Sequence, residues 1–214
     1  LLLAAIPLFI FSQQAIAQVD TWYSFQSGEW GDANSWTLDG ATSPSFVNPS
    51  SETPEPGDIV FIRNSHAITM EDGSSNVLDG EEIDEITIRS GSSLNLLTSI
   101  NHDFTDINGS GTLILEGKQN TLGSSDVYEE NLPEGDYTDF ADALLGGIIE
   151  INTAVNNDPF LFNNNLTGIT ATAAGAISKA LRINMGDAND RAIIQRDITL
   201  TGNLTVNQGN LQIH

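Results

Sequence analysis

The C-terminal stretch ITLTGNLTVNQGNLQIH (residues 198–214) repeats one short pattern three times. Each repeat has two aliphatic residues separated by a single polar residue, and Gly- and Asn-containing turns separate the repeats. This period-two alternation is typical of a half-buried β-strand, and Gly and Asn are common in the turns between strands. The three aliphatic pairs are Ile198/Leu200, Leu204/Val206 and Leu211/Ile213.

The same rhythm returns through most of the chain beyond residue 56. Further pairs occur at Ile86/Ile88, Leu94/Leu96 and Leu113/Leu115. Strands only about six to eight residues apart favour a solenoid whose coils hold about 20 residues. We therefore predict an all-β chain that forms a right-handed parallel β-helix over residues 58–214. The alternative is an antiparallel β-sandwich, for which a spacing of about 8–12 residues is more usual.

Two segments depart from the rhythm. Residues 39–57 are rich in proline and predict an extended surface loop. Residues 118–142 are acidic and rich in turn-forming residues, and they predict an insertion that projects from one coil.

The N-terminal 18 residues, LLLAAIPLFIFSQQAIAQ, have the features of a signal peptide. The apolar run of residues 1–11 is shorter than the roughly 20 residues needed to span a bilayer, and Ala15-Ile16-Ala17 fits a small-x-small cleavage site. We expect a secreted or cell-surface protein with no membrane span after cleavage. Because the C-terminal end stops within a strand-like pattern, we also expect a fragment that is truncated at the C-terminus of a longer protein.

Three tryptophans follow the leader, and SGEWGDANSW (residues 27–36) contains two of them. One interpretation is an exposed aromatic platform for sugar rings. The other is a structural cap formed by Trp22, Trp30 and Trp36 within residues 19–57. A stack of strands must cover its first apolar layer and its unpaired edges, and large aromatic rings bury area efficiently. We favour the cap.

The stretches SGEWGDANSWT, PEPGDIVFIRNSHAITM and EIDEITIRSGSSLNL resemble the start of large exported surface adhesins of the Bacteroidota. Their openings follow the pattern SGxWxDxxxW, a Pro-Gly-Asp turn and then strand repeats. The resemblance implies a parallel β-helix, secretion by a type IX-like route, and attachment to the cell surface by a C-terminal sorting domain. It carries no catalytic residue to this chain.

Charge narrows the classes of partner. Seven Lys and Arg residues against 29 Asp and Glu residues give a net charge of −22, which repels nucleic acid and anionic lipid. The chain has no cysteine, so thiol catalysis, disulfides and zinc–thiolate sites are excluded. The few basic residues are scattered along the sequence, and they predict no cationic cluster.

Motifs for catalysis and cofactors are missing from the sequence. His66, His102 and His214 have no metal-binding spacing, and there is no nucleophile elbow or phosphate-binding loop. We assign no catalytic residue and no cofactor. A calcium site remains an alternative because carboxylates dominate, although a solvated acidic face is the simpler interpretation. Its candidate ligands are Asp136, Asp139 and Asp142, or the cluster of Glu81, Glu82, Asp84 and Glu85.

Two functional hypotheses follow. We favour a non-enzymatic structural and adhesive module that displays polar faces toward a surface, a glycan or a protein partner. The alternative is a non-catalytic front part of a carbohydrate-active enzyme, either a polysaccharide lyase or a glycoside hydrolase. Fold class alone does not separate the two.

Overall fold

A computed structural model describes residues 19–214 except 49–50, 64, 71–79, 123–124, 154–158 and 163–167. The signal peptide predicted for residues 1–18 lies outside the described residues. The described chain is mostly strand, and its one helical segment is the short 3-10 helix η1 (Ala33–Ser35). Within this part of the chain, no helix combines the length and apolar character that a bilayer crossing demands.

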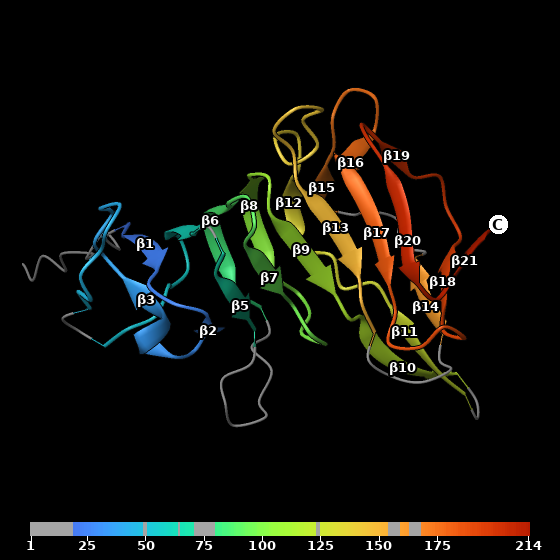
Figure 1. Cartoon of the computed structure of the whole chain (residues 1–214), viewed down its shortest axis with the longest axis horizontal. Coiled ribbons are helices and arrows are strands. Elements are labelled where there is room, and N and C mark those ends of the chain that lie inside the picture. Colours follow the sequence, from blue (N-terminus) through green and yellow to red (C-terminus); the bar gives the residue numbers. More distant parts are fainter. Residues whose placement is uncertain are drawn as a thin grey trace, which may run out of the picture.

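Three main sheets and one small sheet make up the fold, and Figure 1 shows their strands side by side along the long axis. The first sheet has the spatial order β15 (Ile169–Thr170), β12 (Glu134–Asp136), β8 (Asp103–Asn108), β6 (Glu82–Ile88), β4 (Ile59–Ile62), β1 (Thr21–Ser24) and β3 (Trp36–Thr37). The second has the order β2 (Gly28–Glu29), β5 (Ala67–Thr69), β7 (Ser93–Asn95), β9 (Thr112–Leu115), β13 (Ile148–Ile151), β17 (Ala180–Asn184) and β20 (Leu204–Gln208). The third has the order β10 (Lys118–Leu122), β11 (Ser125–Glu129), β14 (Pro159–Phe162), β18 (Arg191–Ile194) and β21 (Asn210–Ile213), and β16 (Ala176–Ser178) pairs with β19 (Thr199–Leu200).

The prediction of a right-handed parallel β-helix is wrong, because the sheets are mixed and the described residues show no closed solenoid. Strand β3 pairs antiparallel with β1, and β10 pairs antiparallel with β11. The described strands before residue 118 belong only to the first and second sheets, and the third sheet starts with β10. Local alternation specifies which face of a strand is buried, but it does not specify which neighbour the strand pairs with.

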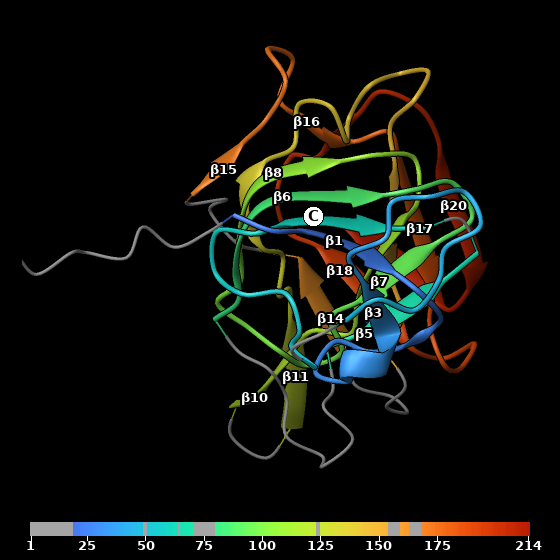
Figure 2. The same cartoon turned by 90° about the vertical axis from the view of Figure 1, so that its left-hand side faces the viewer.

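The antiparallel sandwich does not describe the chain either. Apart from those two pairs, the described neighbours in the three main sheets are parallel. Parallel neighbours place equivalent residues of successive strands beside each other, as in the row Ile68, Leu94, Leu113 and Ile149. These rows belong to the apolar core. Figure 2 shows the strands from the N-terminal end of the stack.

The segment 118–142, for which the sequence predicts an acidic insertion, contains strands of two sheets. This segment supplies β10 and β11 to the third sheet and β12 to the first sheet. Aromatic residues within it are buried, including Tyr137 and Phe140 at 0 % exposure. The acidic composition was misleading because polar and acidic residues are themselves buried here, as in Glu130 at 8 % and Asn131 at 6 % exposure.

The three tryptophans lie at the N-terminal end of the stack and are all buried. Trp22 belongs to β1, Trp30 follows β2, and Trp36 belongs to β3, which is the edge strand of the first sheet. The indole Nε1 of Trp36 donates to the Trp30 carbonyl at 2.8 Å, and their ring centroids are 5.0 Å apart at 73°. A sugar platform needs an exposed ring face, so burial contradicts that interpretation. The cap formed by Trp22, Trp30 and Trp36 stays a prediction.

Candidate ligand-binding site

Two arginines meet where the chain passes from the first sheet to the second. Arg63 directly follows β4 and Arg89 directly follows β6. Ile62 and Ile88, the last residues of these strands, are register partners, and the Arg89 amide donates to the Ile62 carbonyl at 3.1 Å. The parallel register therefore places the two arginines in adjacent layers at one corner of the molecule.

Stacked aromatic rings hold both guanidinium groups. Tyr23 of β1 and Phe61 of β4 are register partners on the outer face, and their rings stack at 5.2 Å with an interplanar angle of 13°. The Arg63 guanidinium carbon lies 4.8 Å from the Tyr23 ring centroid, and that of Arg89 lies 5.4 Å from the Phe61 centroid. Each arginine thus lies over the ring of the preceding layer, an attractive cation–π geometry that restricts where the charge can point.

A serine–histidine contact lies beside the arginines. Ser24 Oγ is 2.8 Å from His66 Nδ1 and also accepts the Arg63 backbone amide at 2.8 Å. Ser24 is fully buried, at 0 % exposure. The pair therefore positions the imidazole and the turn after β4, and it does not present the hydroxyl to a substrate.

Asp39 shapes the loop on the other side of the corner. Its carboxylate accepts the backbone amides of Ala41 and Ser45, both at 2.9 Å. These two hydrogen bonds lower the pKa of Asp39, so the carboxylate stays ionised and directed at its own loop. The Asp39 carbonyl also accepts a hydrogen bond from Arg63 Nη2. The loop is thereby fixed against the arginine.

A pocket of about 360 Å³ lies between this loop and the arginines, and we call it the corner pocket. One wall is cationic or ionisable and the other is apolar or small. The lining residues are Arg63, His66, Arg89, Phe25, Gly40, Ala41, Thr42 and Pro44. Its volume lies within the usual range for small-molecule sites, about 300–1,000 Å³.

One guanidinium donor of Arg63 has no partner among the described residues. Arg63 Nη1 is buried and makes no hydrogen bond to any residue that the structure describes. A buried charged donor without an acceptor is costly, and such a group is an indication of a missing partner. Burial and the nearby Arg89 cation both lower the pKa of Arg63, but an arginine remains protonated at neutral pH. The corner pocket is therefore suited to an anion.

The pKa of His66 is lowered from its ordinary value of 6.5, first by burial and then by the Arg63 cation, while the contact with Ser24 acts in the opposite direction. We expect an NMR titration of the imidazole to give a pKa below 6.5. Between that pKa and 6.5 the unfolded chain binds a proton that the folded chain does not, so the free energy of unfolding should rise with pH across this window. His66→Gln should lack this rise in urea titrations. A measured pKa at or above 6.5 would contradict the prediction.

Beyond the arginines, the outer face of the first sheet becomes strongly acidic. Glu85, Asp106 and Asp136 are register partners across β6, β8 and β12. A second row, Glu82, Asp103 and Glu134, crosses the same strands. The pKa of Asp106 is raised, mainly by burial and further by neighbouring carboxylates. Like charges directly opposite each other on parallel strands repel.

Neutralising the centre of this row should stabilise the fold. We expect Asp106→Asn to raise the free energy of unfolding by about 0.5 kcal/mol at neutral pH, because it removes repulsion from both neighbouring strands. A group whose pKa is raised on folding destabilises the fold once it ionises, so the gain should disappear as the pH falls and the wild-type carboxyl becomes protonated. Urea denaturation at two pH values measures this, with the exposed Asp197→Asn as control. A destabilised Asp106→Asn variant would contradict it.

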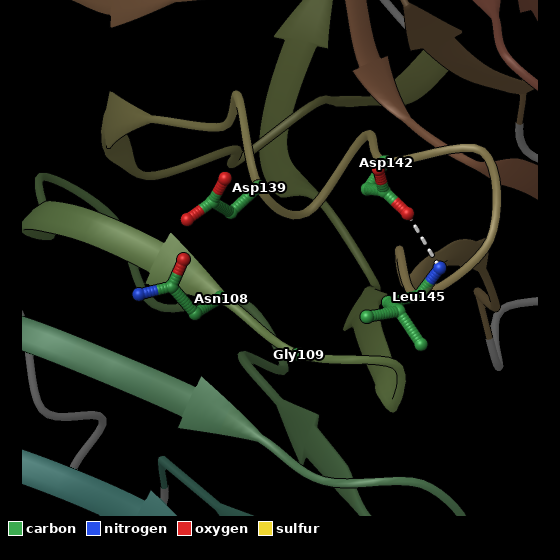
Figure 3. Close-up of a pocket in the computed structure, with 5 residues that line it drawn as sticks. All are labelled: Asn108, Gly109, Asp139, Asp142 and Leu145. Atoms are coloured by element: carbon green, nitrogen blue, oxygen red, sulfur yellow. Dashed lines mark hydrogen bonds between the residues drawn. The ribbon is translucent and has the colours of Figure 1, made fainter.

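A second pocket, of about 370 Å³, lies at the far end of β8 and is acidic. Figure 3 shows Asn108 and Asp139 on one side of it, with Asp142 and Leu145 opposite. The Asp142 carboxylate accepts the backbone amides of Leu144 at 2.8 Å and Leu145 at 2.6 Å, so it caps its own turn.

These carboxylates bear on the calcium alternative. Asp136 likewise accepts the amide of Thr138 at 2.8 Å. No group of three metal-binding side chains is found within the described ranges. Neither calcium cluster named from the sequence is therefore brought together as a metal site by the described residues, and the corner pocket is the stronger candidate for ligand binding.

Sequence reasoning missed the corner pocket because it found no cationic cluster. The prediction that the basic residues do not cluster is wrong for Arg63 and Arg89, whose charges are close enough to lower the pKa of Arg63. A signal was present: both arginines follow an isoleucine at the end of a strand, in FIR and in TIR, 26 residues apart. Only the register of β4 and β6 makes that repeat a spatial pair.

Comparison with protein-family models, with curated proteins and with solved structures finds no match for this chain.

Proposed function

We propose that this chain is a non-enzymatic structural and adhesive module of a secreted or cell-surface protein. In this proposal the corner pocket binds an anionic group of an extracellular glycan or surface protein. The observation that carries it is the pairing of Arg63 and Arg89 in one pocket of a chain with a net charge of −22. Positively charged residues are rare in this chain, so two of them in one pocket indicate a role in binding rather than in solubility.

The geometry supports binding rather than turnover. The guanidinium groups are held by aromatic rings, and Arg63 keeps a buried donor without a partner among the described residues. The serine beside His66 is buried and engaged by the backbone, so it is not placed as a nucleophile. The stacked parallel sheets supply a stiff support on which the pocket is displayed.

The test uses surfaces that carry sparse end groups of one kind: carboxylate, sulfate ester or hydroxyl. By biolayer interferometry, we expect binding to at least one anionic surface, little binding to the hydroxyl surface, and a loss of affinity as salt is added. Arg63→Gln/Arg89→Gln should lower the affinity at least roughly tenfold, because a charge-assisted hydrogen bond contributes about 1.5–3 kcal/mol. Arg191→Gln is the matched control, because Arg191 is an exposed residue of β18 outside the pocket. This variant should bind as the wild type does.

Two outcomes would overturn the proposal. One is equal binding to the anionic and hydroxyl surfaces, or unchanged binding by the double variant. The other is release of reducing sugar from an acidic polysaccharide by the purified chain, which would favour the carbohydrate-active alternative.

A further inference from the structure

The geometry points to a specific occupant of the corner pocket: a single sugar ring that carries one carboxylate, a uronic acid residue at the end of a glycan. This inference rests on the proposed function and narrows it, because it names the ligand class of the same pocket. Four observations carry it: the shape of the donors, the local charge, the apolar wall and the acidic rows beyond the pocket.

The donors favour a planar acceptor. Two arginines line the pocket, and the rings of Tyr23 and Phe61 fix the position of both guanidinium groups. A guanidinium is a flat fork of donors that matches a carboxylate with two parallel hydrogen bonds. The Arg63 fork is not saturated, since its Nη1 has no hydrogen-bond partner among the described residues.

The local charge favours one negative charge. Arg63 and Arg89 carry two positive charges, and the Asp39 carboxylate, held by the loop amides, carries one negative charge. His66 is neutral at pH 7 because its pKa is lowered. The pocket therefore keeps one net positive charge. A monoanion neutralises it, whereas a dianionic phosphate would leave a net negative charge.

The rest of the pocket suits a ring and not a bare ion. Phe25 lines the pocket, and its ring packs against Phe46 at 5.5 Å with an interplanar angle of 64°. An aromatic wall offers apolar area to the carbon-bound hydrogens of a sugar, and Thr42, on the loop held by Asp39, also lines the pocket and carries a hydroxyl of the kind that pairs with sugar hydroxyls. The small residues Gly40 and Ala41 complete the lining.

The acidic rows limit the ligand to a chain end. Glu85 lies on β6, the strand that Arg89 follows, and it begins the row that continues through Asp106 to Asp136. A polyuronate running across the first sheet would place its next carboxylates against this row, where like charges repel. A terminal acidic residue avoids that contact.

NMR titration with matched glycosides tests the inference. The probes are methyl β-glucuronide, methyl β-glucoside, the glucoside 6-sulfate and 6-phosphate, sodium acetate, and a linear tetra-uronide. We expect the glucuronide to bind at least tenfold more tightly than the glucoside and more tightly than the sulfate, the phosphate and acetate. The tetra-uronide should bind no more tightly than the single ring.

Variants separate the contributions of charge and ring. Arg89 is exposed, so Arg89→Gln should not impair folding. It should lower the affinity for the glucuronide at least tenfold and leave the affinity for the glucoside unchanged. Phe25→Ala should lower the affinity for the glucuronide severalfold and leave the affinity for acetate unchanged. Phe46 does not line the pocket, so Phe46→Ala should have a smaller effect on glucuronide binding. Arg191→Gln should behave as wild type.

The failures of the two proposals are distinguishable. If the sulfate or phosphate binds best, if acetate equals the glucuronide, or if the tetra-uronide binds much more tightly than the single ring, the uronic acid inference fails while an anion-binding module survives. If no anion binds and Arg89→Gln changes nothing, both fail.

Discussion

Replacing Trp36 with alanine should lower the free energy of unfolding by about 3–5 kcal/mol, the usual cost of deleting a buried aromatic side chain. Trp36 is 0 % exposed, its ring packs edge-on against Trp30, and its Nε1 donates to the Trp30 carbonyl. The substitution would open a cavity at the N-terminal end of the stack and expose the edge of the first sheet. Urea denaturation followed by tryptophan fluorescence or circular dichroism measures the loss.

Two controls sharpen the Trp36 experiment. Leu144→Ala, on a side chain that is 83 % exposed, should change the free energy of unfolding by less than about 0.5 kcal/mol. Trp36→Phe keeps a ring but removes the Nε1 donor, so its cost should lie between those of the other two variants. If Trp36→Ala cost no more than Leu144→Ala, the tryptophans would not be acting as a cap.

Replacing Gly109 with alanine should lower the free energy of unfolding by more than about 3 kcal/mol, among the larger effects of a single substitution. Gly109 has a φ of +100°, and a Cβ built there would lie 2.1 Å from the Ile88 carbonyl oxygen. That oxygen accepts the Gly111 amide at 2.8 Å, so it cannot move away without breaking a hydrogen bond between layers.

Gly57 provides a matched control for Gly109. Its φ is +90°, but a Cβ there would meet nothing within 4 Å. Gly57→Ala should therefore cost only the left-handed backbone penalty, about 1–2 kcal/mol. The difference between the two variants isolates the steric clash with the neighbouring layer. Equal costs for both would show that the turn relaxes around the new methyl group.

Much of the interior could be predicted from the alternation of apolar residues. Ile86, Ile88, Leu94 and Leu96 were expected to be buried from their spacing, and all four are at 0 % exposure. The prediction is less successful at the C-terminal end, where Leu204 and Val206 are each 46 % exposed. They belong to β20, which is the edge strand of the second sheet and has a neighbour on one side only.

The pairing of strands could not be predicted in the same way. The strand-turn rhythm is equally compatible with a hairpin such as β10/β11 and with a parallel pair such as β13/β17. The choice depends on contacts between residues tens of positions apart, and no local pattern encodes them. For this reason the prediction of a regular solenoid is wrong, although the alternation correctly identifies buried residues such as Ile86 and Leu94 away from the C-terminal edge.

The corner pocket shows most clearly the difference between what local alternation determines and what strand pairing determines. Side-chain alternation, a property of each strand alone, indicates from the sequence that Ile86 and Ile88 face the interior. The register between β4 and β6 then placed Arg63 beside Arg89, and the loop held by Asp39 closed the pocket around them. Which residues are buried follows from local geometry. Which charges meet follows from long-range pairing, so only the tertiary structure decided it.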